Sequence, residues 1–475
     1  MKLKILIITF FLPFTLLLQA QIKVAPVLGD NMVMQRNTEV RLWGTAKPND
    51  KLTITVGWNG LKVNTVSNAK GEWLVTVKTT EAGGPYSISV SNQKQTLVFK
   101  NILLGEVWLC SGQSNMEMPV LGFLDSPVNG SNDALLEADN NDIRFFTVKN
   151  TASATPNDTC IGKWSVASAE TVGKFSAVGY FFAKQLQSKL NVPVGMICSS
   201  WGGSRIEAWI SKDYMIKYPE PLKLTTKENL QPKWTASQLY NGMISPIKNY
   251  VFKGVLWYQG ENNRLRDEYQ YYTELMKGLV ENWRNDFGIG QFPFYFVQIA
   301  PYWYNNSKDI LSGKFCDQQM KASLTIPNCG MVVTTDLGEE KNIHPAEKAI
   351  VGKRLAFWAF SETYGIKGIN CKNTYFKSAV AKDSTMIVSF ENASRGITSF
   401  GKELTNFQIA GEDKVFYPAK ASIVIGSSQL NVWATEVKVP VSVRYGYCNF
   451  PQGTGFLYNT AGLPVPSFRS DNWGK

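Results

Sequence analysis

Two side chains of this sequence, one serine and one histidine, have the types and settings needed for nucleophilic catalysis. The chain contains a single histidine, His344, so a serine nucleophile with a histidine base has to use it. The candidate serine is Ser114 in the run Gly112-Gln113-Ser114-Asn115-Met116, directly after the apolar stretch 107–110. A serine on a tight turn after a strand presents its hydroxyl at the sheet edge, and its own N–H can help to bind an oxyanion. The alternatives are an ordinary turn serine and a histidine on a surface loop.

The surroundings of both residues refine this prediction. Met116 stands where the nucleophile elbow of the α/β-hydrolases has its second glycine, so that elbow is disfavoured. His344 follows a strand that ends near Thr335, and Pro345 suits the first position of the next helix. We therefore expect the histidine on a strand-to-helix loop. Imidazole can take and return a proton near neutral pH because its ordinary pKa is about 6.5.

Two further loops carry polar groups directly after apolar strands. Residues 200–205 contain two glycines whose N–H groups can face an oxyanion, and residues 257–263 offer side-chain amides. Acyl transfer needs several fixed hydrogen-bond donors around its tetrahedral intermediate. Each loop alone is compatible with an ordinary turn. Four polar loops after four strands predict one active site at the carboxyl edge of a parallel sheet.

The apolar patterning predicts an α/β chain with three parts that position these loops. Residues 21–100 and 364–475 read as short strands with turns between them, which predicts an N-terminal and a C-terminal β module resembling sandwiches. In residues 101–363 strands alternate with helices, which predicts a three-layer α/β/α domain with a parallel sheet. The expected strands are 106–110, 194–199, 254–258, 294–299 and 331–335. The expected helices are 177–190, 268–285 and 346–360.

The first 20 residues have the composition of a secretory signal peptide. Lys2 and Lys4 precede an apolar run from Ile5 to Leu18, and Ala20 offers a small residue for cleavage. The alternative is a membrane anchor, but the run is shorter than the roughly 20 residues that a spanning helix needs. No other stretch is long and apolar enough to span. The sequence therefore predicts export to the periplasm or the outside, with no membrane span in the mature form.

Charge and cysteine content exclude some classes of function. The formal charge is +11, and the loss of two lysines with the signal leaves about +9. This charge is scattered, without the dense basic run that nucleic-acid binding needs, and an acidic substrate or an ordinary lysine-rich surface both agree with it. The seven cysteines show no metal-ligand spacing, so neither a zinc site nor a cofactor is expected. A disulfide between Cys316 and Cys329 is possible in an oxidising compartment.

The motif set resembles the sialate O-acetylesterases, which belong to the SGNH-type serine hydrolases. The resemblance is carried by 112–116, by Ser-Trp-Gly-Gly at 200–203, by Trp-Tyr-Gln-Gly-Glu at 257–261 and by Asp-Leu-Gly…Ile-His-Pro at 336–345, and it covers nearly the whole mature chain. It implies a serine esterase that removes acetyl groups from hydroxyls of sialic acids without a metal or an organic cofactor.

The resemblance also implies roles for particular residues. Ser114 matches the nucleophile and His344 the base, while Gly202 or Gly203 and Asn263 match the oxyanion donors, with Asn262 a close competitor. The side chains expected to bind substrate or to order the site are Arg205, Gln113, Gln259, Glu261 and Trp201.

One departure from the family concerns the acid that orients the histidine. The family commonly has an aspartate two or three residues before the histidine, where this chain has Asn342 and Lys341. Asp336 is the upstream candidate that we expect to take the role, with Glu339 and Glu340 as alternatives. A backbone carbonyl could hold the ring instead, which would make a Ser–His dyad.

Three functions therefore enter the comparison with the structure. The first is an esterase acting on O-acetylated sialic acid, and the second is an esterase acting on other acetylated polysaccharides such as xylan. The third is a carbohydrate-binding protein whose central site is degenerate. The complete set of serine, glycine, asparagine and histidine argues against the third.

Overall fold

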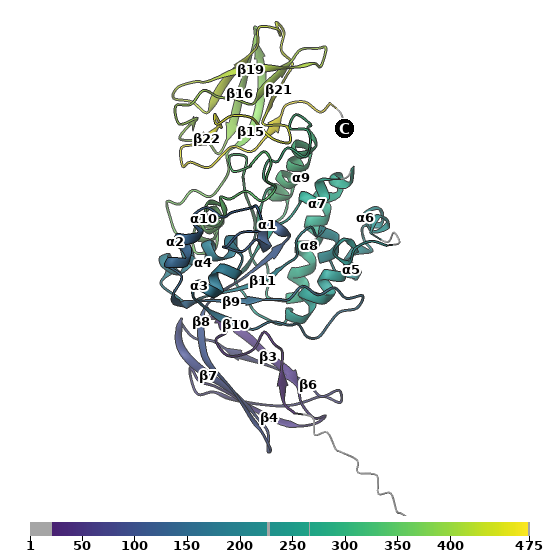
Figure 1. Cartoon of the computed structure of the whole chain (residues 1–475), viewed down its shortest axis with the longest axis vertical. Coiled ribbons are helices and arrows are strands. Elements are labelled where there is room, and N and C mark those ends of the chain that lie inside the picture. The colour runs from purple at the N-terminus through teal and green to yellow at the C-terminus, as the bar shows by residue number, and fades with distance from the viewer. Residues whose placement is uncertain (1–20, 226–228, 266, 474–475) are drawn as a thin grey trace, which may run out of the picture.

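The computed structural model describes residues 21–225, 229–265 and 267–473, so the expected signal peptide lies outside the described residues. Three parts follow one another along the longest axis of the molecule (Figure 1): N-terminal strands, a central part with helices, and C-terminal strands. The mixed α/β class expected from the sequence is confirmed. No helix among the described residues is long and apolar enough to cross a membrane.

The central sheet contains parallel strands in the order β9-β11-β8-β12-β13-β14, with β10 antiparallel to β9 at one edge. The bounds are β8 Thr96–Gly112, β9 Asn140–Thr147, β10 Trp164–Ala167, β11 Val194–Ser200, β12 Gly254–Tyr258, β13 Phe294–Val297 and β14 Cys329–Val332. The predicted strand 254–258 is found at its expected bounds, whereas β9 and β10 were not predicted. The polar start of β9 at Asn140-Asn141-Asp142 hides its strand character.

Helices cover both faces of this sheet because successive strand residues point to opposite sides. In β12, Leu256 and Tyr258 belong to the core with α4 and α10, whereas Val255 and Trp257 belong to the core with α8 and α9. The helix bounds are α1 Ser114–Glu117, α2 Ser131–Leu136, α3 Ala169–Lys174, α4 Ala177–Leu190, α5 Lys212–Met215, α6 Pro219–Leu224, α7 Glu261–Arg264, α8 Tyr272–Phe287, α9 Leu311–Thr325 and α10 Lys348–Trp358. The α4 bounds agree with the predicted 177–190.

The N-terminal strands are joined to the central sheet through β8. The first half of this 17-residue strand pairs antiparallel with β7, and its second half lies between β11 and β12. The expected boundary between residues 100 and 101 therefore falls inside a continuous strand. The other N-terminal strands are β1 Lys23–Val24, β2 Val33–Gln35, β3 Glu39–Thr45, β4 Lys51–Val56, β5 Lys62–Val66, β6 Glu72–Lys78 and β7 Gly83–Ser91.

The C-terminal strands form a seven-stranded sheet with its own hydrophobic core. Its strands are β15 Tyr375–Lys382, β16 Thr385–Glu391, β18 Phe407–Ala410, β19 Phe416–Ile423, β20 Gln429–Trp433, β21 Ser442–Tyr445 and β23 Phe468–Arg469, and β17 Ile397–Thr398 pairs with β22 Tyr458–Asn459. This part is tied to the central part by Asn449, whose Oδ1 accepts hydrogen bonds from Arg264 and from the N–H of Ser312.

The cysteine expectation is wrong at one point. All seven cysteines lie in the described part of the chain and are free, so Cys316 in α9 and Cys329 in β14 are not joined. Burial raises the pKa of both thiols, which agrees with cysteines that pack as small apolar side chains.

Candidate active site

The polar loops predicted from the sequence begin at one level of the central sheet. Gly112 at the end of β8 pairs with Ser200 at the end of β11 and with Tyr258 at the end of β12. Gly112 has φ +133°, and a Cβ at this position would lie 2.2 Å from the Tyr258 carbonyl oxygen. Only glycine can end β8 this close to β12. The loops that carry Ser114, Gly202 and Glu261 therefore leave the carboxyl edge side by side.

Ser114 is the first residue of the short helix α1 and lies against the glycine turn after β11. A Cβ built on Gly202 would be 3.4 Å from Ser114 Cβ, which shows how closely the two loops approach. Ser114 is half-buried, while its neighbour Asn115 is buried. The serine hydroxyl thus lies where the β8 and β11 loops meet.

The histidine loop is joined to the serine loop by a hydrogen bond between flanking residues. Asn115 Nδ2 donates to the Ile343 carbonyl oxygen at 3.0 Å, so the residue after Ser114 holds the residue before His344. The imidazole meets the Phe123 ring edge to face at 5.2 Å between centroids. No hydrogen bond joins Ser114 Oγ to the imidazole within the described residues. Such contacts are often long in an empty site and tighten when substrate binds.

Burial and, to a smaller extent, the nearby Lys348 ammonium together lower the pKa of His344 to about 4. The imidazole is consequently neutral over the whole neutral pH range. A neutral imidazole can accept the proton of a serine hydroxyl, which is what a general base has to do.

The acid expected to orient His344 has another partner. Asp336 forms a two-pronged ion pair with Arg354, at 2.8 and 2.7 Å between carboxylate oxygens and guanidinium nitrogens. Its carboxylate therefore faces Arg354 rather than the imidazole, and the expectation for Asp336 is corrected. Asn342, at the position of the usual acid, accepts the backbone N–H of His344 through Oδ1 at 3.0 Å. Its Nδ2 donates to Glu339, so Asn342 shapes the backbone of this loop.

The two glycines proposed as oxyanion donors differ in this structure. The N–H of Gly202 donates to Glu117 Oε2 at 2.6 Å, so a carboxylate oxygen lies on this donor. Gly203 has φ +68° and accepts hydrogen bonds at its carbonyl oxygen from Asn262 and from Trp234. Gly202 is therefore the glycine whose N–H already holds a negatively charged oxygen next to Ser114.

Asn263 lies in a buried hydrogen-bond network between neighbouring loops. Its Nδ2 donates to Glu207 at 2.9 Å, and its Oδ1 accepts from the Ile206 N–H and from Gln259. Asn263 thus joins the β11 and β12 loops, and its oxyanion role stays a prediction. Asn262 bridges two neighbours: its Nδ2 donates to the Gly203 carbonyl oxygen and its Oδ1 accepts from Arg205.

Gln113, Gln259 and Glu261 were expected to bind substrate or to order the site, and all three are buried. Gln113 Oε1 accepts from Gln259 Nε2 at 3.1 Å and from the Gly260 N–H at 3.2 Å. Glu261 accepts a hydrogen bond from Asn115. Gln113 and Gln259 are thus hydrogen-bonded to each other, while Glu261 is bonded to Asn115 through one carboxylate oxygen and its other oxygen, Oε2, is buried without a hydrogen-bond partner among the described residues.

Arg205 and Trp201 were expected to bind substrate. Arg205 is only 1% exposed, donates to Asn262 Oδ1 at 3.3 Å and lies 5.4 Å from the Trp234 ring centroid. Trp201 is half-buried, and its backbone N–H donates to the Gly112 carbonyl oxygen at 3.0 Å. Trp201 is thus partly exposed, whereas Arg205 is buried beside Asn262 and Trp234.

Four residues near Ser114 were not singled out in the sequence: Asn115, Glu117, Phe123 and Lys348. Asn115 lies inside the serine motif and Lys348 lies four residues after His344, so spacing from the two reactive residues was the available signal. Phe123 and Glu117 gave no such signal, because a phenylalanine and a carboxylate are common on any loop.

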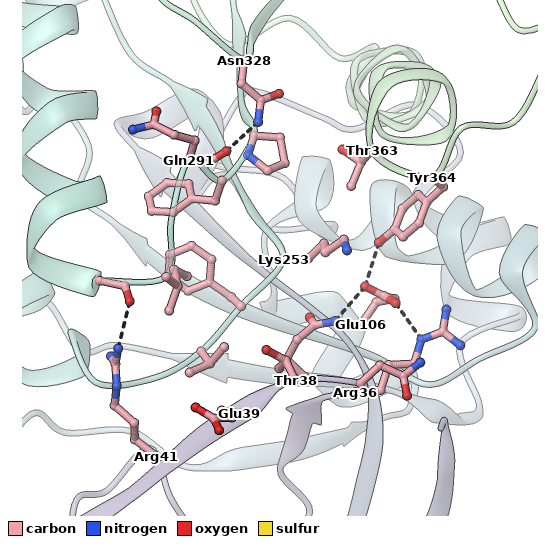
Figure 2. A pocket seen from close by; sticks show the side chains of 18 of the residues that line it. Arg36, Thr38, Glu39, Arg41, Glu106, Lys253, Gln291, Asn328, Thr363 and Tyr364 are labelled. Atoms are coloured by element: carbon pink, nitrogen blue, oxygen red, sulfur yellow. Dashed lines mark hydrogen bonds and ion pairs between the residues drawn. The ribbon is translucent and has the colours of Figure 1, made fainter. Parts of the chain in front are cut away.

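A cavity of about 850 Å³ lies away from these loops, between the N-terminal strands and the central part. Its lining residues Lys253, Pro293 and Asn328 precede β12, β13 and β14, so it opens at the amino edge of the sheet. Figure 2 shows Glu106 bonded there to Arg36 and Tyr364. The loops that follow β8, β11 and β12 lie at the opposite edge. No group of three metal-ligating side chains occurs among the described residues.

Comparison with known proteins identifies the family. A sequence model of the carbohydrate esterases described as sialic acid-specific acetylesterases matches residues 104–360. The chain belongs to this family. Its relatives include the sialate O-acetylesterases of Mus musculus, 29% identical over 405 residues (73% of this chain and 74% of the relative), and of Homo sapiens, 30% identical over 379 residues (73% and 72%).

The structure of this esterase is also similar to a solved one. The crystal structure of a carbohydrate acetylesterase from Xanthomonas citri superimposes with a TM-score of 0.86 at 31% identity, covering 95% of this chain and 100% of that chain. The protein is thus a carboxylic ester hydrolase of a family that acts on acetylated sugars.

Proposed function

We propose that this esterase is exported and hydrolyses O-acetyl esters of sialic acids, with Ser114 as nucleophile and His344 as base. The observation that carries the proposal is the hydrogen bond from Asn115 to the Ile343 carbonyl oxygen, which ties the two reactive residues' loops together. The apolar, lysine-flanked first 20 residues support export. The three-layer arrangement of the central part supports an SGNH-type domain, flanked by β modules at 21–100 and 364–475.

The reaction proceeds in two halves. Ser114 Oγ attacks the acetyl carbonyl carbon while His344 takes the hydroxyl proton, and the carbonyl oxygen becomes an oxyanion. The bond to the sugar oxygen then breaks, and His344 returns the proton to that oxygen. In the second half His344 takes a proton from a water, which attacks the acetyl carbon on Ser114; the bond from that carbon to Ser114 Oγ breaks, His344 returns the proton to Oγ, and acetate leaves.

The oxyanion is received by the N–H groups of Ser114 and Gly202. Substrate binding displaces the Glu117 carboxylate from Gly202, so the acyl oxygen takes the position of the carboxylate oxygen that accepts the Gly202 N–H. Two backbone donors held by the ends of β8 and β11 need no reorganisation during the reaction. The histidine works in a Ser–His dyad, since Asp336 is held by Arg354.

A second substrate class, other acetylated polysaccharides, is favoured by one observation. The similar Xanthomonas citri structure is a carbohydrate acetylesterase and is covered over its full length, whereas the sialate O-acetylesterases match about three quarters of the chain.

Acetate release tests the function and separates the two substrates. We expect the wild type to hydrolyse an aryl acetate and Ser114→Ala to lose this activity, with Ser131→Ala on the surface helix α2 as the matched control. Equal rates for wild type and Ser114→Ala would refute the serine mechanism. Faster release from O-acetylated sialic acid than from acetyl-xylan supports the first substrate, and the reverse order supports the second.

A further inference from the structure

A buried cluster of three polar side chains lies beneath Ser114 and His344 and takes no direct part in the reaction proposed above. Asn115, Glu261 and Lys348 are 1%, 2% and 0% exposed. They come from α1, α7 and α10, which are far apart in the sequence. A lysine this deeply buried is costly for a fold unless it is paired and hydrogen-bonded, so its presence here calls for a reason.

Asn115 is the centre of this cluster. Its Nδ2 donates to the Glu261 carboxylate and to the Ile343 carbonyl oxygen, and its Oδ1 accepts from Lys348 Nζ at 2.6 Å. A lysine can only donate, whereas a carboxylate and a carbonyl oxygen can only accept. Only one orientation of the amide satisfies all three partners. Lys348 thus fixes the amide in the orientation that lets Nδ2 hold the histidine loop.

Lys348 also contributes a positive charge that acts on the histidine. Its ammonium lies 5.8 Å from the centroid of the Tyr258 ring in β12, and the carboxylates of Glu261 and Glu339 oppose the effect of burial on it. Burial lowers the pKa of Lys348 to about 7, so the side chain is charged at the acidic pH where His344 titrates. In the usual triad an anion lies beside the imidazole, whereas the charge that helps to lower the pKa of His344 here is the Lys348 ammonium.

We propose that Lys348 is a positioning residue of this esterase, which holds the Ser114 and His344 loops in register through Asn115 and places a positive charge near the imidazole. The proposal rests on the proposed function of Ser114 and His344. Lys348 then acts on the imidazole with a positive charge, whereas the orienting acid of a triad acts with a negative charge. Without Lys348, the amide of Asn115 loses its fixed orientation and the imidazole gains a proton at higher pH.

The single histidine gives a direct test by NMR, because one labelled imidazole reports without assignment once any histidine tag is removed. Titration of wild type and Lys348→Met is compared with Lys353→Met, whose lysine is exposed on the same helix. We expect the pKa of His344 to rise by about one unit in Lys348→Met and to stay unchanged in Lys353→Met. An unchanged pKa in folded Lys348→Met overturns the proposal. Lys348→Gln serves the same test if the methionine variant does not fold.

Kinetics test the positioning role in the same variants. We expect kcat of Lys348→Met to fall by about 10- to 100-fold with KM within about threefold of wild type, since a small misplacement of reacting groups can cost that much. The double variant with Asn115→Ala should lose no more than the worse single variant, because both changes break one link. Losses that multiply, or a kcat equal to wild type, overturn the proposal. The NMR titration needs no activity, so failure of Ser114→Ala to abolish hydrolysis would refute the proposed function separately.

Discussion

Replacement of Glu117 by glutamine tests whether the Gly202 N–H is an oxyanion donor. Glu117 Oε2 accepts a hydrogen bond from this N–H at 2.6 Å, and Asn150 donates to the other carboxylate oxygen. A hydrogen bond to a charged group contributes roughly 1.5–3 kcal/mol, and the half-buried position of Glu117 favours the lower end. The hydrogen bond from the Gly202 N–H to a neutral amide contributes about 0.5–1 kcal/mol. Displacing the side chain of residue 117 from this N–H therefore costs the substrate about 1 kcal/mol less.

The expected result is a rise in kcat/KM of about fivefold for Glu117→Gln, since 1.36 kcal/mol corresponds to tenfold. Loss of a negative charge next to the developing oxyanion acts in the same direction. The assay is aryl acetate hydrolysis under kcat/KM conditions, with Glu170→Gln on the exposed face of α3 as the matched control. A fall in kcat/KM of tenfold or more, at unchanged Tm, would refute this reasoning. It would mean that the carboxylate itself serves the reaction or keeps the Gly202 turn in place.

Three further predictions follow from contacts already described. Because burial lowers the pKa of His344 to about 4 and only neutral imidazole is active, kcat/KM should stay level from pH 7 to about 5 and fall tenfold per unit below pH 4; a limb near pH 6.5 would contradict this. Asp336→Ala should lower the free energy of unfolding by about 3 kcal/mol, because Arg354 is left buried without its partner, while kcat changes by less than about threefold; chemical denaturation and kinetics measure the two effects. Reductant should leave the Tm unchanged, since Cys316 and Cys329 are free, and a large fall on reduction would reveal a disulfide.

The sequence predicts the central elements well where one physical signal dominates. The apolar run 254–258 and the helical spacing over 177–190 give β12 and α4 at their expected bounds. The ends of a helix are harder to predict where one helix type passes into another. The helix expected at 268–285 is a 3₁₀ turn over Asp267–Tyr271 followed by α8 Tyr272–Phe287. Strand β9 was missed because its polar start at Asn140-Asn141-Asp142 shortens the apolar run that marks a buried strand.

The candidate site was predicted in position but not in its hydrogen bonds. A single histidine and a serine after a strand locate His344 and Ser114, because both facts are properties of the sequence. Whether Gln259 or Asn263 faces a ligand or a buried network depends on the side-chain direction, which residue type does not reveal. Lys348 is the clearest case, since a lysine in an exposed-looking stretch such as Ala346–Ala349 gives no sign that it is fully buried.

The continuous course of β8 has a consequence for how the protein loses its structure. The strand carries backbone hydrogen bonds of the N-terminal sheet in its first half and ends at the nucleophile turn. Unfolding of the N-terminal strands would therefore disturb the end of β8 that precedes Ser114. We expect heat to unfold the N-terminal strands and the central part in one cooperative transition, with loss of activity in the same temperature range. A shortened chain beginning at residue 101 would start in mid-strand and would leave the β2 partner of residues 103–105 absent. The N-terminal strands thus act as a folding partner of the esterase part rather than as a detachable appendage.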